Sequence, residues 1–204
     1  MLGIIDYGAG NIKSVCNALD ALGADYRVVD NVSHVRDFDG VILPGVGSFG
    51  DAMAQLEERG FTDFIKEYTA KNNHFLGICL GLQLLFEYSA ESSDVKGLGV
   101  FEGGFVKFPP DLGLKVPHIG WNTLKADKNS IFGGVNGKEV YFVHSYYLEK
   151  CGDISAATTD YGFEFTCAVQ KGNVCACQFH PEKSGEVGLE IIQNFINLCK
   201  KEEE

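Results

Sequence analysis

Short apolar runs alternate with segments of helical periodicity in the first half of the chain. The apolar runs predict strands at 2–5, 26–29, 41–43 and 74–78, and the periodic segments predict helices at 12–22, 51–58, 61–71 and 80–88. This alternation is typical of βα units, which build a parallel sheet with helices on both faces. Asn11 is a candidate N-cap for the first helix, and Gly23 is placed to end it.

Beyond about residue 97 the pattern changes to paired strands with glycine-rich turns. Segments 99–101 and 105–108 predict one hairpin, and segments 165–169 and 174–179 predict a second. A last amphipathic helix is predicted at 185–200, and the charged residues 200–204 are expected to form a solvated tail. We therefore predict one α/β domain spanning 1–204, with a mixed, mostly parallel sheet flanked by helices.

The net charge and the cysteine content indicate which partners and which cellular compartment are expected. The net charge of -11 argues against nucleic acid or an anionic membrane as a partner, because phosphate groups would be repelled. The seven cysteines are odd in number and scattered, which is typical of free thiols in a reducing compartment. We read all except Cys79 as core thiols. No apolar stretch is long enough to cross a bilayer, so we expect a cytoplasmic protein.

Cys79 lies in the sequence Gly-Ile-Cys-Leu-Gly, between a predicted strand and a predicted helix. That context is typical of a nucleophile elbow, in which the flanking glycines allow a sharp turn and keep the approach to the nucleophile open. The N–H groups at a helix N-terminus favour a thiolate there. A lone cysteine is more often a buried core residue, and only the flanking sequence distinguishes this one.

His180 and Glu182 provide the groups that a cysteine nucleophile requires. The histidine follows a predicted strand, and Pro181 disfavours helix at that point. In an extended segment, residues two apart project to the same side, so Glu182 can accept the Nδ1 proton of His180 and leave Nε2 facing Cys79. Alone, each residue would more commonly be an ordinary surface group.

Gly45, Val46 and Gly47 follow another strand and can turn backbone N–H groups toward an oxyanion, with the N–H of Leu80 as second donor. Without the elbow, a plain turn would be the better interpretation. Gly8–Gly10 lacks the third glycine of a dinucleotide loop, and no phosphate-binding loop is present. Cys175 and Cys177 have no partner pair at zinc-type spacing, so we predict neither a metal nor a cofactor.

Taken together, these motifs resemble the class I glutamine amidotransferases over essentially the whole chain. Further segments narrow the resemblance to the glutaminase subunits of imidazole glycerol phosphate synthase: residues 5–11, 117–122, 141–146 and 178–184. The resemblance implies that Cys79 attacks the side-chain amide of glutamine, that His180 transfers protons and that Glu182 orients His180. It also implies that the ammonia passes to a (β/α)8-barrel cyclase subunit, which makes imidazole glycerol phosphate and AICAR in histidine biosynthesis.

The same resemblance suggests roles at further positions. Gly45, Val46, Gly47 and Leu80 correspond to the oxyanion strand and its partner, and Gln83, Glu91, His144 and Tyr146 to substrate-site positions. Asn11, Trp121, Tyr141 and Lys183 correspond to positions that face the cyclase, although surface polarity or core packing would also explain them. The chain ends soon after its last helix, so we expect the cyclase to be a separate subunit in a heterodimer.

Two alternatives remain open at this point. The triad would equally serve a glutaminase for another acceptor, such as pyridoxal phosphate synthase or anthranilate synthase, although segments 117–122 and 141–146 argue against it. The other alternative is a non-catalytic amidotransferase that regulates a partner through the same surface. The presence of all three catalytic side chains argues against this second interpretation.

Overall fold

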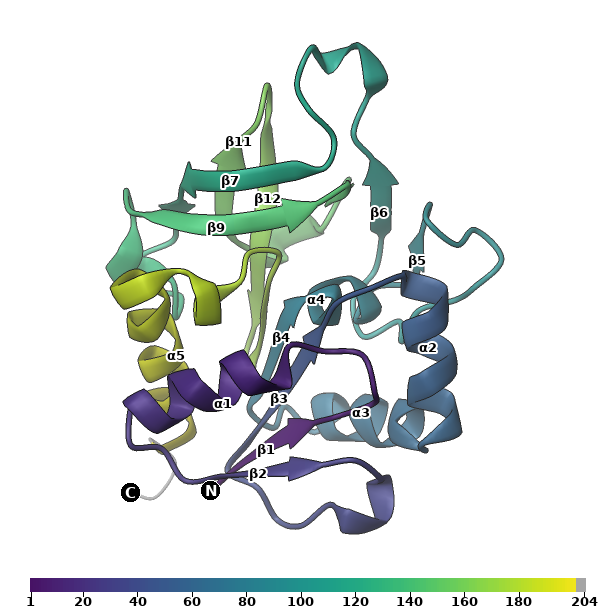
Figure 1. The fold of residues 1–204 in the computed structure, drawn as a ribbon, viewed down its shortest axis with the longest axis vertical. Helices are drawn as coiled ribbons and strands as arrows, with labels where there is room; N and C mark the ends of the chain where they lie inside the picture. The colour runs from purple at the N-terminus through teal and green to yellow at the C-terminus, as the bar shows by residue number, and fades with distance from the viewer. Residues whose placement is uncertain (201–204) are drawn as a thin grey trace.

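A mixed sheet of eleven strands organises the protein, whose computed structural model describes residues 1–200 (Figure 1). Its main path runs β2-β1-β3-β4-β13-β12-β10-β6-β5, with β11 and β8 attached beyond β12. The first-half strands are β1 (Leu2–Ile5), β2 (Tyr26–Val29), β3 (Gly40–Gly45), β4 (Phe75–Cys79) and β5 (Tyr88–Ser89). Pairings from β2 through β4 to β13 are parallel, as the βα alternation predicts.

The later strands pair mostly antiparallel and extend the sheet. They are β6 (Gly104–Lys107), β8 (Lys125–Ala126), β10 (Tyr146–Leu148), β11 (Ser155–Asp160), β12 (Glu164–Lys171) and β13 (Val174–Cys177). The hairpin of β12 and β13 confirms the one predicted at 165–179. A separate two-stranded ribbon, β7 (His118–Thr123) with β9 (Glu139–His144), lies beside the sheet (Figure 1) and was not predicted from the sequence.

Helices cover both faces of the parallel part. They are α1 (Ile12–Ala21), α2 (Phe49–Glu58), α3 (Phe61–Ala70), α4 (Leu80–Leu84) and α5 (Gly185–Lys200). Alternate residues of each strand point to opposite faces. Thus Ile42 packs in the core beneath α1 and α5, whereas Val41 and Leu43 pack in the core beneath α2 and α3. Figure 1 shows the two helix pairs on opposite sides of the strands.

Two sequence predictions are wrong around residues 80–108, and one set of hydrogen bonds explains both. The helix predicted at 80–88 ends at Leu84, because the carbonyls of Leu84, Leu85 and Phe86 accept N–H groups from 98–101. That returning segment therefore forms no strand. The predicted hairpin of 99–101 with 105–108 is absent, and β6 pairs instead with β5 and β10.

Other local predictions have simpler outcomes. Gly23 follows α1 with a positive φ of 63°, as expected of a helix-ending glycine. Asn11 occupies the N-cap position of α1, but its side chain forms no capping hydrogen bond. The tail predicted at 200–204 falls almost wholly outside the described residues. No helix within residues 1–200 combines the length and apolar character needed to span a membrane.

The cysteines follow the predicted pattern in part. None of the seven forms a disulfide within residues 1–200. Cys167, Cys175, Cys177 and Cys199 are buried in the core, as expected. Cys16 and Cys151 pack against the core but are only half-buried, so the prediction that they are buried thiols is wrong. Their positions in an amphipathic helix and beside a surface turn account for the exposure.

Close packing of α4 against β3 explains one glycine of the elbow. A methyl group on Gly81 would overlap the carbonyl oxygen of Leu43, so only glycine allows α4 to lie this near the strand. Neither Gly77 nor Gly81 has a positive φ, whereas Cys79 itself has φ 55°. The flanking glycines therefore serve close packing, and the nucleophile position makes the sharp turn.

Gly81→Ala is expected to lower the free energy of unfolding by about 2–3 kcal/mol, because the added methyl group must displace α4 or β3. The matched control is Gly137→Ala. This glycine has open space around its Cα and φ 80°, so the cost is backbone strain of about 1 kcal/mol. Urea denaturation of both variants gives the comparison, and equal losses would contradict the packing argument.

Candidate active site

The ends of three adjacent parallel strands form the site. Gly45 at the end of β3 is in register with Cys79 at the end of β4, and β13 pairs with the other side of β4. His180 follows β13 by three residues. Parallel strands bring their carboxyl ends to one edge of the sheet, where ligands bind in open α/β folds. Residues far apart in the sequence therefore meet at this edge.

Cys79 is positioned by a strained turn between β4 and α4. Its φ of 55° and ψ of -108° are rare for a residue with a side chain, and such strain is typical of functional positions. Cys79 is the N-cap residue of α4, so the unpaired N–H groups of the first helical turn lie beside it. The side chain is buried in the protein but lines a cavity.

His180 and Glu182 form a buried pair. The distance between Nδ1 of His180 and Oε1 of Glu182 is 2.7 Å, and both side chains are 1% exposed. This hydrogen bond fixes Nδ1 as the donor and leaves Nε2 available. Within residues 1–200, Nε2 of His180 has no hydrogen-bond partner, and Oε2 of Glu182 has none either. The compact spacing of two residues thus places the carboxylate as the sequence predicts.

The backbone of His180 is held by two neighbouring elements. Its N–H donates to the carbonyl of Tyr141 in β9 at 2.9 Å, and its carbonyl accepts from the hydroxyl of Ser184 at 2.7 Å. Ser184 Oγ in turn accepts the N–H of Tyr141 at 2.9 Å. These three hydrogen bonds link His180, Ser184 and Tyr141 in a ring. Strand β9 therefore helps to fix the backbone position of His180, from which the imidazole extends.

Electrostatics favour a protonated His180. Burial alone lowers the pKa of this imidazole, but its interactions with Cys79 and then Glu182 outweigh burial and raise the pKa to about 9. His180 is therefore an imidazolium at neutral pH. An imidazolium beside a cysteine stabilises the thiolate and can supply a proton to a leaving group.

The site opens into a cavity of about 400 Å3, which is the size of a small-molecule site. Ten of its lining residues are named individually from the sequence. The lining comprises Val46, Gly47, Cys79, Leu80, Gln83, Glu91, Pro117, Val143, His144, Ser145, Tyr146, His180 and Lys183. Gly45 lies just behind it, because a methyl group there would meet Tyr7 and Leu80. The sequence-derived set is thus largely gathered in one place.

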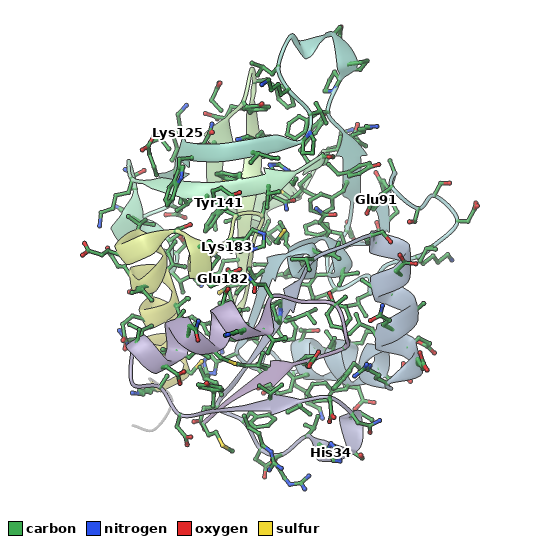
Figure 2. The ribbon with its side chains drawn as sticks, viewed as in Figure 1. His34, Glu91, Lys125, Tyr141, Glu182 and Lys183 are labelled. Carbon is green, nitrogen blue, oxygen red and sulfur yellow. The ribbon has the colours of Figure 1, made fainter. Side chains whose placement is uncertain are left out.

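Glu91 and Tyr146 occupy the cavity wall away from the triad. Glu91 Oε2 accepts the N–H of Phe49 at 2.7 Å, at the start of α2, which anchors the carboxylate (Figure 2). The pKa of the Tyr146 phenol is raised, first by burial and second by the charge of Glu91, so these two side chains are close. A carboxylate in this position can receive a cationic group of a ligand.

Both ring nitrogens of His144 already contact protein groups. Its Nδ1 donates to the carbonyl of Tyr146 at 2.8 Å, and its Nε2 lies 3.0 Å from Nδ1 of His118. Burial lowers the pKa of His144 to about 3, so the ring is neutral. Because protein groups occupy both ring nitrogens, His144 shapes the cavity wall and has no free nitrogen for a ligand.

Gln178 is a functional-site residue that the sequence analysis did not single out. Its Nε2 lies 3.7 Å from Sγ of Cys79, and its Oε1 accepts a hydrogen bond from Gln83 at 3.0 Å. The available signal was a lone polar residue directly after the fully buried strand β13. The sequence alone does not show that β13 pairs with β4, and it is this pairing that brings Gln178 beside Cys79.

The four residues predicted to face a partner lie on β7, on β9, on η5 (Pro181–Lys183) and at the N-cap of α1. Trp121 and Tyr141 are register partners on the β7–β9 ribbon, with ring centroids 5.9 Å apart, and Trp121 is 52% exposed. Lys183 belongs to η5, which contacts both β9 and α1, and Asn11 begins α1. Figure 2 shows Tyr141 and Lys183 on neighbouring segments close to Glu182.

Comparisons with known proteins agree with this geometry. The family model "Glutamine amidotransferase class-I" matches residues 3–198. Imidazole glycerol phosphate synthase subunit HisH of Caldanaerobacter subterraneus is 48% identical, with 98% of this chain and 99% of the relative covered. Imidazole glycerol phosphate synthase hisHF of Arabidopsis thaliana is 45% identical over 95% of this chain and 33% of its own length.

A solved structure titled "Crystal structure of glutamine amidotransferase" has the same fold, with a TM-score of 0.77 at 20% identity and coverage of 97% of this chain and 98% of that one. The family match spans nearly every described element of the fold, and the Caldanaerobacter relative is aligned with this chain over almost its full length. The chain therefore belongs to the class I glutamine amidotransferases and, within them, to the imidazole glycerol phosphate synthase subunit HisH family.

Proposed function

We propose that this glutamine amidotransferase hydrolyses L-glutamine with Cys79, His180 and Glu182 and passes the ammonia to a separate cyclase subunit. The observation that carries the proposal is the nucleophile at a strand end, beside a buried His–Glu pair, in one cavity. The family relatives supply the second part, since they are named as subunits of imidazole glycerol phosphate synthase. Together the two subunits would make imidazole glycerol phosphate and AICAR in histidine biosynthesis.

In the first half-reaction, the Cys79 thiolate attacks the side-chain amide carbon of glutamine. The carbonyl oxygen becomes an oxyanion, which the N–H of Leu80 and the N–H groups of Val46 and Gly47 would stabilise. Nε2–H of His180 then protonates the departing nitrogen. The carbon–nitrogen bond breaks, ammonia leaves, and a glutamyl thioester remains on Cys79.

In the second half-reaction, water attacks the thioester. The neutral imidazole of His180 takes a proton from the water through Nε2, and the carbon–sulfur bond breaks to regenerate the thiolate. Glutamate leaves, and the imidazolium is restored. Throughout the cycle Glu182 remains a carboxylate that keeps the Nδ1–H tautomer and stabilises the charge on His180.

The cavity walls would hold the amino-acid end of glutamine. Glu91 is the candidate partner of the α-ammonium, because its carboxylate is anchored at α2 and faces the cavity. Gln83 and the backbone around Tyr146 are polar groups on the same walls. Gly47 has φ 98°, which glycine adopts without strain, so the peptide after Val46 has the freedom to reorient.

The proposed partner is a (β/α)8-barrel cyclase in a heterodimer. Support comes from the Arabidopsis relative, whose name joins both parts and of which this chain matches 33%. Ile119 and Trp121, exposed on the same face of β7, offer the apolar contact area that subunit interfaces use. The free thiols and acidic charge favour a cytoplasmic protein that binds neither membrane nor nucleic acid.

Cys79→Ala is expected to reduce glutamate release by roughly three orders of magnitude or more, because no other group can form the thioester. The assay mixes the protein with a cyclase subunit and its substrate and follows glutamate. Cys16→Ala, which removes a half-buried thiol on α1, should match the parent protein. Complex formation should be unchanged in both variants. Persistent glutaminase activity in Cys79→Ala would refute the proposed mechanism.

The raised pKa of His180 predicts a pH dependence of stability. The folded-state pKa of about 9 exceeds the ordinary value of 6.5, so protonated His180 adds stability that is complete below pH 6.5 and lost as the pH rises through 9. Glu182→Gln should flatten that decline in the free energy of unfolding. Replacing the exposed His34 by Gln serves as control. An undiminished decline in Glu182→Gln would mean that the ion pair is not its source.

Trp121→Ala is expected to weaken cyclase binding by roughly 10- to 100-fold, because large aromatic side chains dominate interface energies. Isothermal titration of the two subunits measures the change. Val28→Ala is the control: Val28 is also an exposed apolar side chain, but β2 lies at the opposite end of the molecule from β7 (Figure 1). If both variants bind as the parent does, the ribbon is not the interface.

A further inference from the structure

Two buried glutamine side chains form a short chain of hydrogen bonds that ends on the nucleophile. Gln83 Nε2 donates to Gln178 Oε1 at 3.0 Å, and Gln178 Nε2 lies 3.7 Å from Sγ of Cys79. Gln178 is 1% exposed and Gln83 is 5% exposed. Gln83 lines the cavity, whereas Gln178 lies outside its lining, behind the nucleophile.

The pairing fixes which end of the Gln178 amide faces the sulfur. An amide oxygen accepts and an amide nitrogen donates. Because Oε1 is occupied by the N–H of Gln83, Nε2 is the group presented to Cys79. A donor in this position favours a charged sulfur over a neutral thiol, since hydrogen bonds to charged acceptors are about twice as strong as neutral ones.

We propose that Gln178 is a further catalytic residue, whose Nε2–H holds the Cys79 thiolate in place for attack, with Gln83 keeping the amide oriented. The inference deepens the proposed function, since it rests on Cys79 being the nucleophile. It assigns Gln83 a second role beside any contact with glutamine. A ligand that forms a hydrogen bond with Gln83 would then change the contact between the Gln178 amide and the Cys79 sulfur.

The other groups around Cys79 show why this donor matters. His180, Tyr7 and Cys177 are titratable side chains whose ionisation is coupled to that of Cys79, and Glu182 acts behind His180. Burial raises the pKa of both the Tyr7 phenol and the Cys177 thiol, so both are neutral at physiological pH. His180 thus provides one favourable interaction for a buried thiolate, and the Gln178 amide, which does not titrate, provides another.

A purely structural role for Gln178 predicts different behaviour. A core amide that only satisfies Gln83 would change stability when replaced, but it would leave the ionisation of Cys79 unaffected. The test is therefore the pH profile of Cys79 alkylation by iodoacetamide in the isolated protein, without glutamine or cyclase. Peptide mass spectrometry follows Cys79 separately, and the half-buried Cys16 in the same sample is an internal reference.

In Gln178→Met the alkylation midpoint of Cys79 should rise by about one pH unit, and the rate at neutral pH should fall about tenfold, because a hydrogen bond to the charged sulfur is lost. Gln83→Met keeps the donor but removes its orienting partner, so a smaller rise in the same direction is expected. Gln193→Met, on the surface of α5, should change neither quantity. The Cys16 profile should be constant throughout.

An unchanged midpoint in a folded Gln178→Met protein would overturn the proposal. If that variant fails to fold, an unchanged midpoint in Gln83→Met would overturn it equally. The readout also separates this inference from the proposed function, because alkylation requires neither substrate nor partner. Shifted midpoints in a protein without glutaminase activity would keep the Gln178 assignment and reject the reaction.

Discussion

The position of β4 between β3 and β13 is the constraint on which the site depends. β4 is buried along its whole length and parallel to both neighbours, with Gly45 opposite Cys79 and Cys177 opposite Ile78. A slip of one residue would reverse every side chain between the two faces, so burial on both faces fixes the register. Gly45, Cys79 and His180 therefore arrive at one edge without any local sequence signal linking them.

The second constraint is the attachment of His180 to the β7–β9 ribbon. Tyr141 contributes twice: its backbone takes part in the hydrogen bonds that hold His180, and its ring contacts the exposed Trp121. Only one residue thus separates the exposed Trp121 from the backbone of His180.

Sequence reasoning succeeded where the determining interactions are local. The turn at Cys79 and the spacing of His180 and Glu182 are read from a few adjacent residues. The structure places Cys79 between β4 and α4 and pairs His180 with Glu182, as the sequence predicts, whereas the roles of these residues stay a proposal. It failed where distant segments compete for hydrogen bonds. The helix ends at Leu84 because 98–101 claims its carbonyls, and Gln178 gains its meaning only from β4 beside it.

Burial makes the protonation of His180 depend on its two partners, Cys79 and Glu182. Removed from water, the imidazole of His180 would lose its proton, because burial acts to lower its pKa. A neutral imidazole would leave a neutral thiol, since an isolated thiolate is costly in the protein interior. The interaction with Cys79 and, next, the Glu182 carboxylate at 2.7 Å outweigh burial and keep His180 cationic. A spacing of two residues in the sequence thereby places one of the two groups that hold the proton on His180.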